Sequence, residues 1–154
     1  DGRARVAKRL NEKLAGLRGL ATPQVMPDCT HVYYVYGMVL DTDDLGVKRE
    51  TLVKALQAEG VTGLANGYQN VHLLPMFQKK VAFGSHGFPW TSDICHREVS
   101  YAKGICPVAE KLHAETYLGF AMCLHDLSDS DVDLIASAFH KVWGQLDQLK
   151  TVAH

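Results

Sequence analysis

Apolar residues recur at helical spacing in three separate stretches of the chain. The first predicts an amphipathic helix over residues 3–17, and the second a helix over 48–59 that ends at Gly60, a favourable C-terminal glycine. The third begins after Ser128, which is placed to cap the helix, and continues to Leu149. The positions that define these stripes are Val6, Leu10, Leu14, Leu17, Leu52, Val53, Leu56, Val132, Ile135, Phe139, Val142, Leu146 and Leu149.

Strand patterns alternate with these helices. Residues 31–40 are dense in β-branched and aromatic side chains, which predicts a central strand buried on much of both faces. Residues 61–65 and the weakly alternating 117–124 predict further strands, and Pro107 is expected to open another helix that reaches about residue 115. We therefore predict an α+β fold, a small sheet of about three strands with helices packed on one face.

The region from 66 to 104 is the least regular part of the sequence and contains many Gly, Pro, His and aromatic residues. A long connection in a compact domain is usually functional or disordered, and the aromatic content here favours order. Tyr68 and His72 could share a pocket, where they are suited to hold phosphate oxygens or to assist proton movement. The alternative is a packing or turn role for Tyr68 and a satisfied surface site for His72.

Length and charge limit the classes of protein to consider. A chain of 154 residues favours a single domain, residues 1–154, with a core of its own. The 16 basic and 17 acidic residues nearly balance, which argues against a nucleic-acid-binding surface. No apolar stretch approaches membrane-spanning length, and the start of the sequence has no signal-peptide core. We expect a cytoplasmic protein without nucleic-acid or membrane partners, and, since Met does not begin the chain, a processed or excised piece.

The cysteines Cys29, Cys95, Cys106 and Cys123 are widely spaced, and we expect reduced thiols rather than disulfides. Cys95, Cys106 and His113 come nearest to a metal-ligand set, so a small metal enzyme is one hypothesis for this chain. Structural zinc sites normally bring their ligands in close pairs, and this spacing is absent, so we expect no metal. A Cys–His nucleophile pair is a spatial arrangement, and the sequence leaves it open.

Several short stretches, taken in order, resemble the C-terminal part of the DegT/DnrJ/EryC1/StrS family, which are sugar aminotransferases that use pyridoxal phosphate. The similarity runs through almost all of the chain. It is carried by the tyrosine-rich strand, the helix that ends in Glu-Gly-Val, the tyrosine-and-histidine loop, the Cys-Pro-Val-Ala-Glu helix start and the Leu-Ser-Asp that introduces the last helix. These stretches are His31–Tyr36, Arg49–Val61, Gly67–His72, Cys106–Glu110 and Leu127–Asp129.

Members of the family often read His-Tyr-x-Pro-x-His in the loop. Tyr68 and His72 match this pattern, whereas Gly67 and Asn70 depart from it. The resemblance implies that the loop lies near the sugar-nucleotide end of the active site, with Tyr68, Asn70 and His72 as substrate-binding residues. It also implies that this chain holds no catalytic residue, since the lysine that forms the Schiff base lies in a larger preceding domain, absent here.

The resemblance implies a function in amino transfer from an amino acid such as glutamate to a keto-sugar nucleotide. This chain would cover the active site and position the sugar, with a fold like the C-terminal small domain of fold-type I aminotransferases. Pyridoxal phosphate is expected in the full-length enzyme and not on this chain alone. A surface that normally packs on a larger domain is apolar, so we expect a homodimer. The alternative is a freestanding binding or interaction module that descends from such an aminotransferase.

Overall fold

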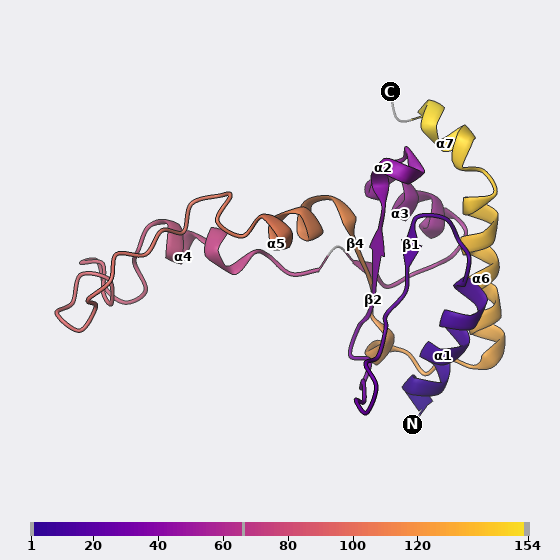
Figure 1. Cartoon of the computed structure of the whole chain (residues 1–154), viewed down its shortest axis with the longest axis horizontal. Helices are drawn as coiled ribbons and strands as arrows, with labels where there is room; N and C mark the ends of the chain where they lie inside the picture. The colour runs from indigo at the N-terminus through magenta and orange to yellow at the C-terminus, as the bar shows by residue number, and fades with distance from the viewer. Residues whose placement is uncertain (1, 66, 153–154) are drawn as a thin grey trace. The chain divides into compact units, whose positions relative to one another are not determined.

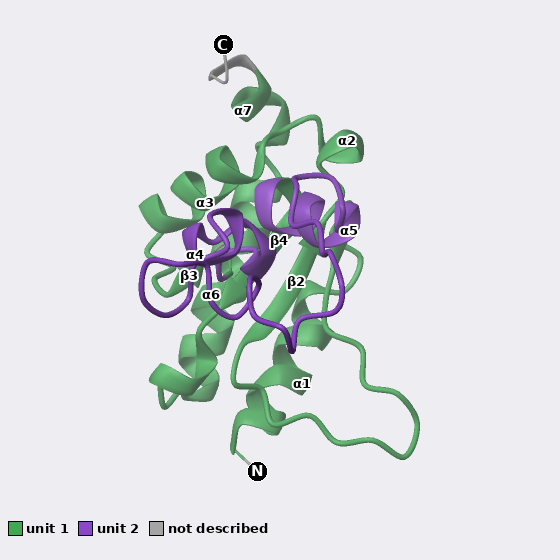
Figure 2. Cartoon of the chain, turned by 90° about the vertical axis from the view of Figure 1, so that its left-hand side faces the viewer, with its two compact units in different colours: residues 1–67, 115–154 green, residues 68–114 purple. Residues whose placement is uncertain are grey.

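The computed structural model describes residues 2–65 and 67–152, which form two compact units (Figure 2). Unit 1 consists of the chain up to residue 67 and from residue 115 onward, and unit 2 consists of residues 68–114. Each unit is described by itself below. The organisation of residues 1–154 as one domain stays a prediction.

Unit 1 contains a four-stranded antiparallel sheet with the strand order β1-β2-β4-β3. Tyr36 lies opposite Phe120 in the central pair, and Leu64 lies opposite the same Phe120 on its other side. The α+β class is confirmed, and the sheet has one strand more than the pattern predicted, because β1 is too short to give an alternating signal. The strands are β1 (Leu20–Ala21), β2 (Tyr36–Leu40), β3 (Leu64–Ala65) and β4 (Tyr117–Phe120).

Three of the strands are shorter than the sequence predicts, and the stretch predicted over 61–65 is a strand at Leu64–Ala65. β2 begins at Tyr36 rather than at residue 31, since Tyr33 has a positive φ of 49° and cannot continue an extended strand. The amide of Tyr33 instead donates to Nδ1 of His31 at 2.8 Å. The strand predicted over 117–124 ends at Phe120, and a 3₁₀ turn (Met122–Leu124) follows it.

The helices of unit 1 include the three that the periodicity predicts, with bounds close to those expected. The capping role of Ser128 is confirmed, because its hydroxyl accepts from the amide of Asp131 while the Asp131 carboxylate accepts from the amide of Ser128. The last stripe is divided at Gly144 into two helices. The helices are α1 (Gly2–Leu14), α2 (Thr42–Leu45), α3 (Arg49–Ala58), α6 (Asp129–Trp143) and α7 (Leu146–Val152).

The core of unit 1 lies between one face of the sheet and the helices α1 and α6, which lie on the same side of the strands (Figure 1). Tyr36 is completely buried there, and its hydroxyl donates to Oδ1 of Asn11 at 2.6 Å. Burial raises the pKa of Tyr36 above its usual range, so this hydroxyl stays protonated. The strand residues on this face are Tyr36, Met38, Leu40, Leu118 and Phe120.

The other face of the sheet carries glycines beneath one aromatic ring. A Cβ atom built on Gly37, Gly67 or Gly119 would lie 3.0 to 3.2 Å from atoms of the Tyr117 ring. The backbone carbonyl of Tyr117 accepts a hydrogen bond from the buried Arg49 at 3.2 Å. The Tyr117 ring therefore packs close to the backbone of Gly67, the last residue of unit 1 before unit 2 begins.

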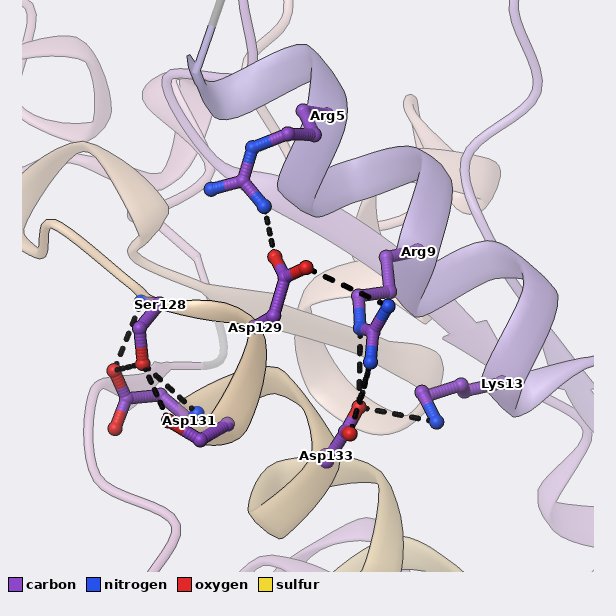
Figure 3. A network of polar contacts seen from close by, with 8 residues as sticks. Arg5, Arg9, Lys13, Ser128, Asp129, Asp131 and Asp133 are labelled. Carbon is purple, nitrogen blue, oxygen red and sulfur yellow. Dashed lines mark hydrogen bonds and ion pairs between the residues drawn. The ribbon is translucent and has the colours of Figure 1, made fainter.

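A ladder of charges joins α1 to α6 (Figure 3). Arg5 pairs with Asp129, and Arg9 forms a bidentate pair with Asp133, in which Nε donates to Oδ1 at 3.0 Å and Nη2 donates to Oδ2 at 2.9 Å. Lys13 reaches the same Asp133 at 3.0 Å. Lys13 and Arg9 hold the pKa of Asp133 below its usual range, so it stays charged at neutral pH. Exposed ion pairs individually contribute little to the free energy of unfolding, so these pairs add contacts between the two helices without much stability.

Unit 2 contains little regular structure, as its Gly and Pro content predicts. A 3₁₀ turn (Val71–Leu73) and α4 (Pro75–Gln78) follow the loop, and α5 (Pro107–Lys111) begins at the proline that the sequence marks as a helix start. The helix continues as a π-helical turn (Leu112–Thr116) into β4. In residues 2–65 and 67–152, every helix is too short or too polar to span a bilayer.

Candidate functional site

The three candidate substrate-binding residues lie at the start of unit 2, in different surroundings. Tyr68 is 79% exposed, and Asn70 is half-buried just before the 3₁₀ turn. The side chain of His72, within that turn, is only 11% exposed. Tyr68 and Asn70 are thus accessible to a ligand, whereas most of the His72 side chain is packed within unit 2 and a small part of it stays exposed.

His72 is held by a residue that sequence reasoning did not select. Its Nε2 lies 2.9 Å from Oε1 of Glu110, whose side chain is 12% exposed. Glu110 lies in α5, 38 residues further along the chain. The sequence marks Glu110 only as part of a helix start, and no spacing signal indicates that it meets the loop.

Glu110 also binds the backbone that precedes its own helix. Its two carboxylate oxygens accept from the amide of Gly104 at 2.8 and 2.9 Å, and Oε1 accepts from the amide of Cys106 at 3.3 Å. The hydrogen bond from the Gly104 amide and, to a smaller extent, the contact with His72 hold the pKa of Glu110 below its usual range. Glu110 is therefore a carboxylate at neutral pH, and it joins the start of unit 2 to its end.

A second set of contacts fixes the backbone around His72. Nε2 of Gln78 donates to the carbonyl oxygens of His72 and Tyr101, both at 2.6 Å. Tyr101 belongs to an aromatic cluster with Phe77 and Trp90, in which Nε1 of Trp90 donates to the Tyr101 hydroxyl at 3.1 Å. From its aromatic content, the sequence predicts that this region is ordered, and the packed aromatic cluster agrees with that prediction.

Surface hollows lie elsewhere in both units. One of about 480 Å³ in unit 2 is lined by Phe77, Gln78, Lys80 and the stretch 98–102. Another of about 840 Å³ in unit 1 is lined by the start of α1 and the stretch 122–127, among others. Neither is lined by the three candidate substrate-binding residues. The loop therefore presents its side chains from a surface rather than from within one of these hollows.

The lysines of this chain do not fit the role of a Schiff-base residue. Such a lysine needs a desolvated site, and every lysine here is exposed or half-buried. Lys13, Lys141 and Lys150 are moreover paired with carboxylates. The buried charged side chain in the described structure is Arg49, which is permanently cationic and cannot serve as an amine nucleophile.

The candidate metal ligands are not assembled into a site. Cys29, Cys95, Cys106 and Cys123 are free thiols. Sγ of Cys95 contacts the carbonyl oxygen of Arg97 at 3.7 Å. Over the described ranges, 2–65 and 67–152, no three His, Cys, Asp or Glu residues form a group that could hold a metal ion.

Comparison with known proteins identifies relatives of the whole fold and of the loop. The model of the DegT/DnrJ/EryC1/StrS aminotransferase family matches residues 1–118, a range that includes unit 2 and most of the sheet. The uncharacterized protein MJ1066 of Methanocaldococcus jannaschii is 26% identical over 98 residues, which are 64% of this chain and 25% of that protein. The spore coat polysaccharide biosynthesis protein SpsC of Bacillus subtilis is 29% identical over 98 residues, with the same coverage.

Solved aminotransferases share the fold over nearly the whole chain. The aminotransferase TlmJ from Streptoalloteichus hindustanus has a TM-score of 0.60 at 24% identity, over 94% of this chain and 32% of that one. An aminotransferase from Psychrobacter cryohalolentis has a TM-score of 0.62 at 19% identity, over 95% and 34%. The chain thus spans about a quarter of the curated relatives' length and about a third of that of the solved chains.

Proposed function

Because the chain belongs to the DegT/DnrJ/EryC1/StrS aminotransferase family, we propose that it acts as the C-terminal part of a sugar-nucleotide aminotransferase. The reaction moves an amino group from an amino acid such as glutamate to a keto-sugar nucleotide. The observation that carries the proposal is the family match over residues 1–118, which includes the entire loop with Tyr68, Asn70 and His72. The similarity to a polysaccharide biosynthesis protein supports a sugar substrate.

In this proposal the chain orients the substrate and does not carry out bond chemistry. Pyridoxal phosphate supplies the amino-transfer chemistry, held by a lysine in a preceding domain, since the lysines here lack the required burial. Tyr68 and Asn70 contact the sugar through their accessible side chains. Correct orientation alone accounts for a large part of many enzymatic rate enhancements.

Self-association belongs to the same proposal. Unit 2 exposes several large apolar side chains, and where such side chains form a contiguous patch they mark an interaction surface. We expect a two-fold homodimer, because a self-complementary patch is the simplest way to cover them. These side chains are Val71, Phe83, Phe88, Ile94 and Val108. The protein is expected to function in the cytoplasm, where nucleotide sugars and reduced thiols occur together.

Treatment of the 154-residue chain with pyridoxal phosphate and then with borohydride tests the proposal that the cofactor is bound by a lysine of another domain. We expect scattered, substoichiometric labelling of exposed lysines and no aldimine absorbance band. A stoichiometric adduct on one defined lysine contradicts the assignment of the cofactor to another domain. Mass spectrometry of the digested chain separates the two outcomes.

A freestanding interaction module is the second candidate, favoured by the complete core and capped helices of unit 1. The reading frame upstream of Asp1 distinguishes it from the aminotransferase. A continuous frame that encodes a lysine-bearing domain supports the aminotransferase. A start codon immediately before Asp1 supports the module.

A further inference from the structure

The hydrogen-bond pattern around Glu110 determines which group carries the proton in its contact with His72. Gly104 and Cys106 approach the carboxylate with backbone amides, which can only donate. The lowered pKa of Glu110 keeps it ionised, so it has no proton to offer. In the 2.9 Å contact the proton must therefore lie on Nε2 of His72.

We propose that Glu110 is a positioning residue that holds His72 as the Nε2–H tautomer and leaves Nδ1 as a hydrogen-bond acceptor. A neutral imidazole carries one proton, and the bond made by one nitrogen sets the state of the other. An acceptor at Nδ1 selects a donor such as a sugar hydroxyl and disfavours a phosphate oxygen, which is itself an acceptor. This inference rests on the proposed function and assigns His72 to the sugar rather than to the diphosphate.

Burial makes the arrangement rigid as well as selective. The side chains of His72 and Glu110 are 11% and 12% exposed, so water has little access to the contact between them. The His72 carbonyl is held independently by Gln78, which fixes the backbone while Glu110 fixes the ring. The imidazole is thus oriented before any ligand arrives, the condition under which binding loses least conformational freedom.

Nitrogen-15 NMR of the ligand-free 154-residue chain at pH 8 tests the tautomer directly. Protonated and unprotonated ring nitrogens have well-separated shifts, and an imidazole N–H proton bonded to a buried carboxylate exchanges slowly enough to be observed. We expect His72 to show a protonated Nε2, an unprotonated Nδ1 and an observable downfield N–H proton. The His72→Gln variant assigns this resonance by its loss.

Substitution of Glu110 shows whether the carboxylate is the cause. In Glu110→Gln the side-chain amide can donate to Nε2, so we expect loss of the single tautomer and movement of the downfield proton. In Glu110→Ala we expect that proton to disappear. Glu98→Gln, an exposed glutamate of the same unit, is the matched control and should leave the His72 spectrum unchanged. A wild-type His72 protonated on Nδ1, on both nitrogens, or insensitive to Glu110→Gln overturns the proposal.

These measurements need neither substrate nor cofactor, so they fail or succeed independently of the proposed aminotransferase activity. In the complete enzyme, Glu110→Gln is expected to raise KM for the keto-sugar nucleotide several-fold while the pyridoxal phosphate content stays the same. A confirmed tautomer together with an unaltered KM would retain the positioning role and remove the sugar contact. The absence of any transamination would instead count against the proposed function.

Discussion

The glycines beneath the Tyr117 ring allow a test of how tightly this side chain is packed in unit 1. Replacing Gly119 by Ala would place a Cβ atom 3.0 Å from the Tyr117 hydroxyl oxygen, 3.1 Å from Cε1 of that ring and 3.1 Å from Cγ1 of Val35. A Cβ atom built on Gly37 or Gly67 would lie 3.2 Å from the same ring, so the ring packs over all three glycines. The added methyl group therefore meets both Tyr117 and Val35, and these side chains must shift to admit it.

Two opposing effects set the expected size of this change. Removing a glycine from a strand stabilises a protein by about 0.5 to 1 kcal/mol through backbone entropy. Overpacking a filled site costs about 1 to 3 kcal/mol. The clash should win, because it involves two side chains, with a net loss of up to about 2.5 kcal/mol in the free energy of unfolding, or up to about 10 °C in Tm for a chain of this length.

Urea denaturation followed by circular dichroism measures the loss. Gly2→Ala is the control, because a Cβ atom there meets nothing within 4 Å. In a double-mutant cycle with Tyr117→Ala, the cost of Gly119→Ala should decrease, since the ring is gone and the close contact that remains is the one with Cγ1 of Val35. A Gly119→Ala variant as stable as wild type, or equally destabilised in both backgrounds, would refute the packing argument.

Three further outcomes follow from the contacts described. Tyr36→Phe removes the bond to Asn11 and should lower the free energy of unfolding by about 0.5 to 1.5 kcal/mol in urea titrations; an unchanged midpoint would contradict this. The pKa of Glu110 is lowered on folding, so its contribution to stability is present at neutral pH and is lost as pH falls through and below the ordinary range of a glutamate, which faster hydrogen exchange at the Gly104 amide should report; pH-independent protection, after correction for intrinsic exchange rates, argues otherwise. Sedimentation of the chain should show a concentration-dependent dimer through unit 2, and a Phe83→Ser variant should weaken it; a strict monomer at micromolar concentration opposes the dimer.

The elements with long, regular patterns are those that the sequence predicts well. The stripe after Ser128 and the apolar run into Gly60 are helices, since each buries one face in the core of unit 1 and has a local cap or stop. The sequence does not predict β1, because its two residues form a strand only through their pairing with β2. The break at Gly144 is not predicted either, because the apolar spacing continues through the interruption.

In the candidate site too, residues in a local sequence pattern can be predicted, whereas residues brought together by the fold cannot. Tyr68 and His72 are identifiable because polar and aromatic residues in a Gly-rich and Pro-rich loop form a local signal. Glu110 is not, because its partners His72 and Gly104 are chosen by the fold of unit 2 and not by spacing. A carboxylate within a short helix looks like any solvated surface residue until the loop is placed beside it.

The central claim is that the loop of unit 2 positions a sugar for an aminotransferase whose cofactor is held elsewhere. The most direct measurement is the dissociation constant of the keto-sugar nucleotide for the complete enzyme, with Tyr68→Phe and His72→Gln compared with wild type. Glutamine keeps a donor for Glu110 while removing the Nδ1 acceptor. Each variant should bind the sugar about 2-fold to 13-fold more weakly, the equivalent of one neutral hydrogen bond, with unchanged pyridoxal phosphate content and Tm. Unchanged dissociation constants in both variants would contradict the account.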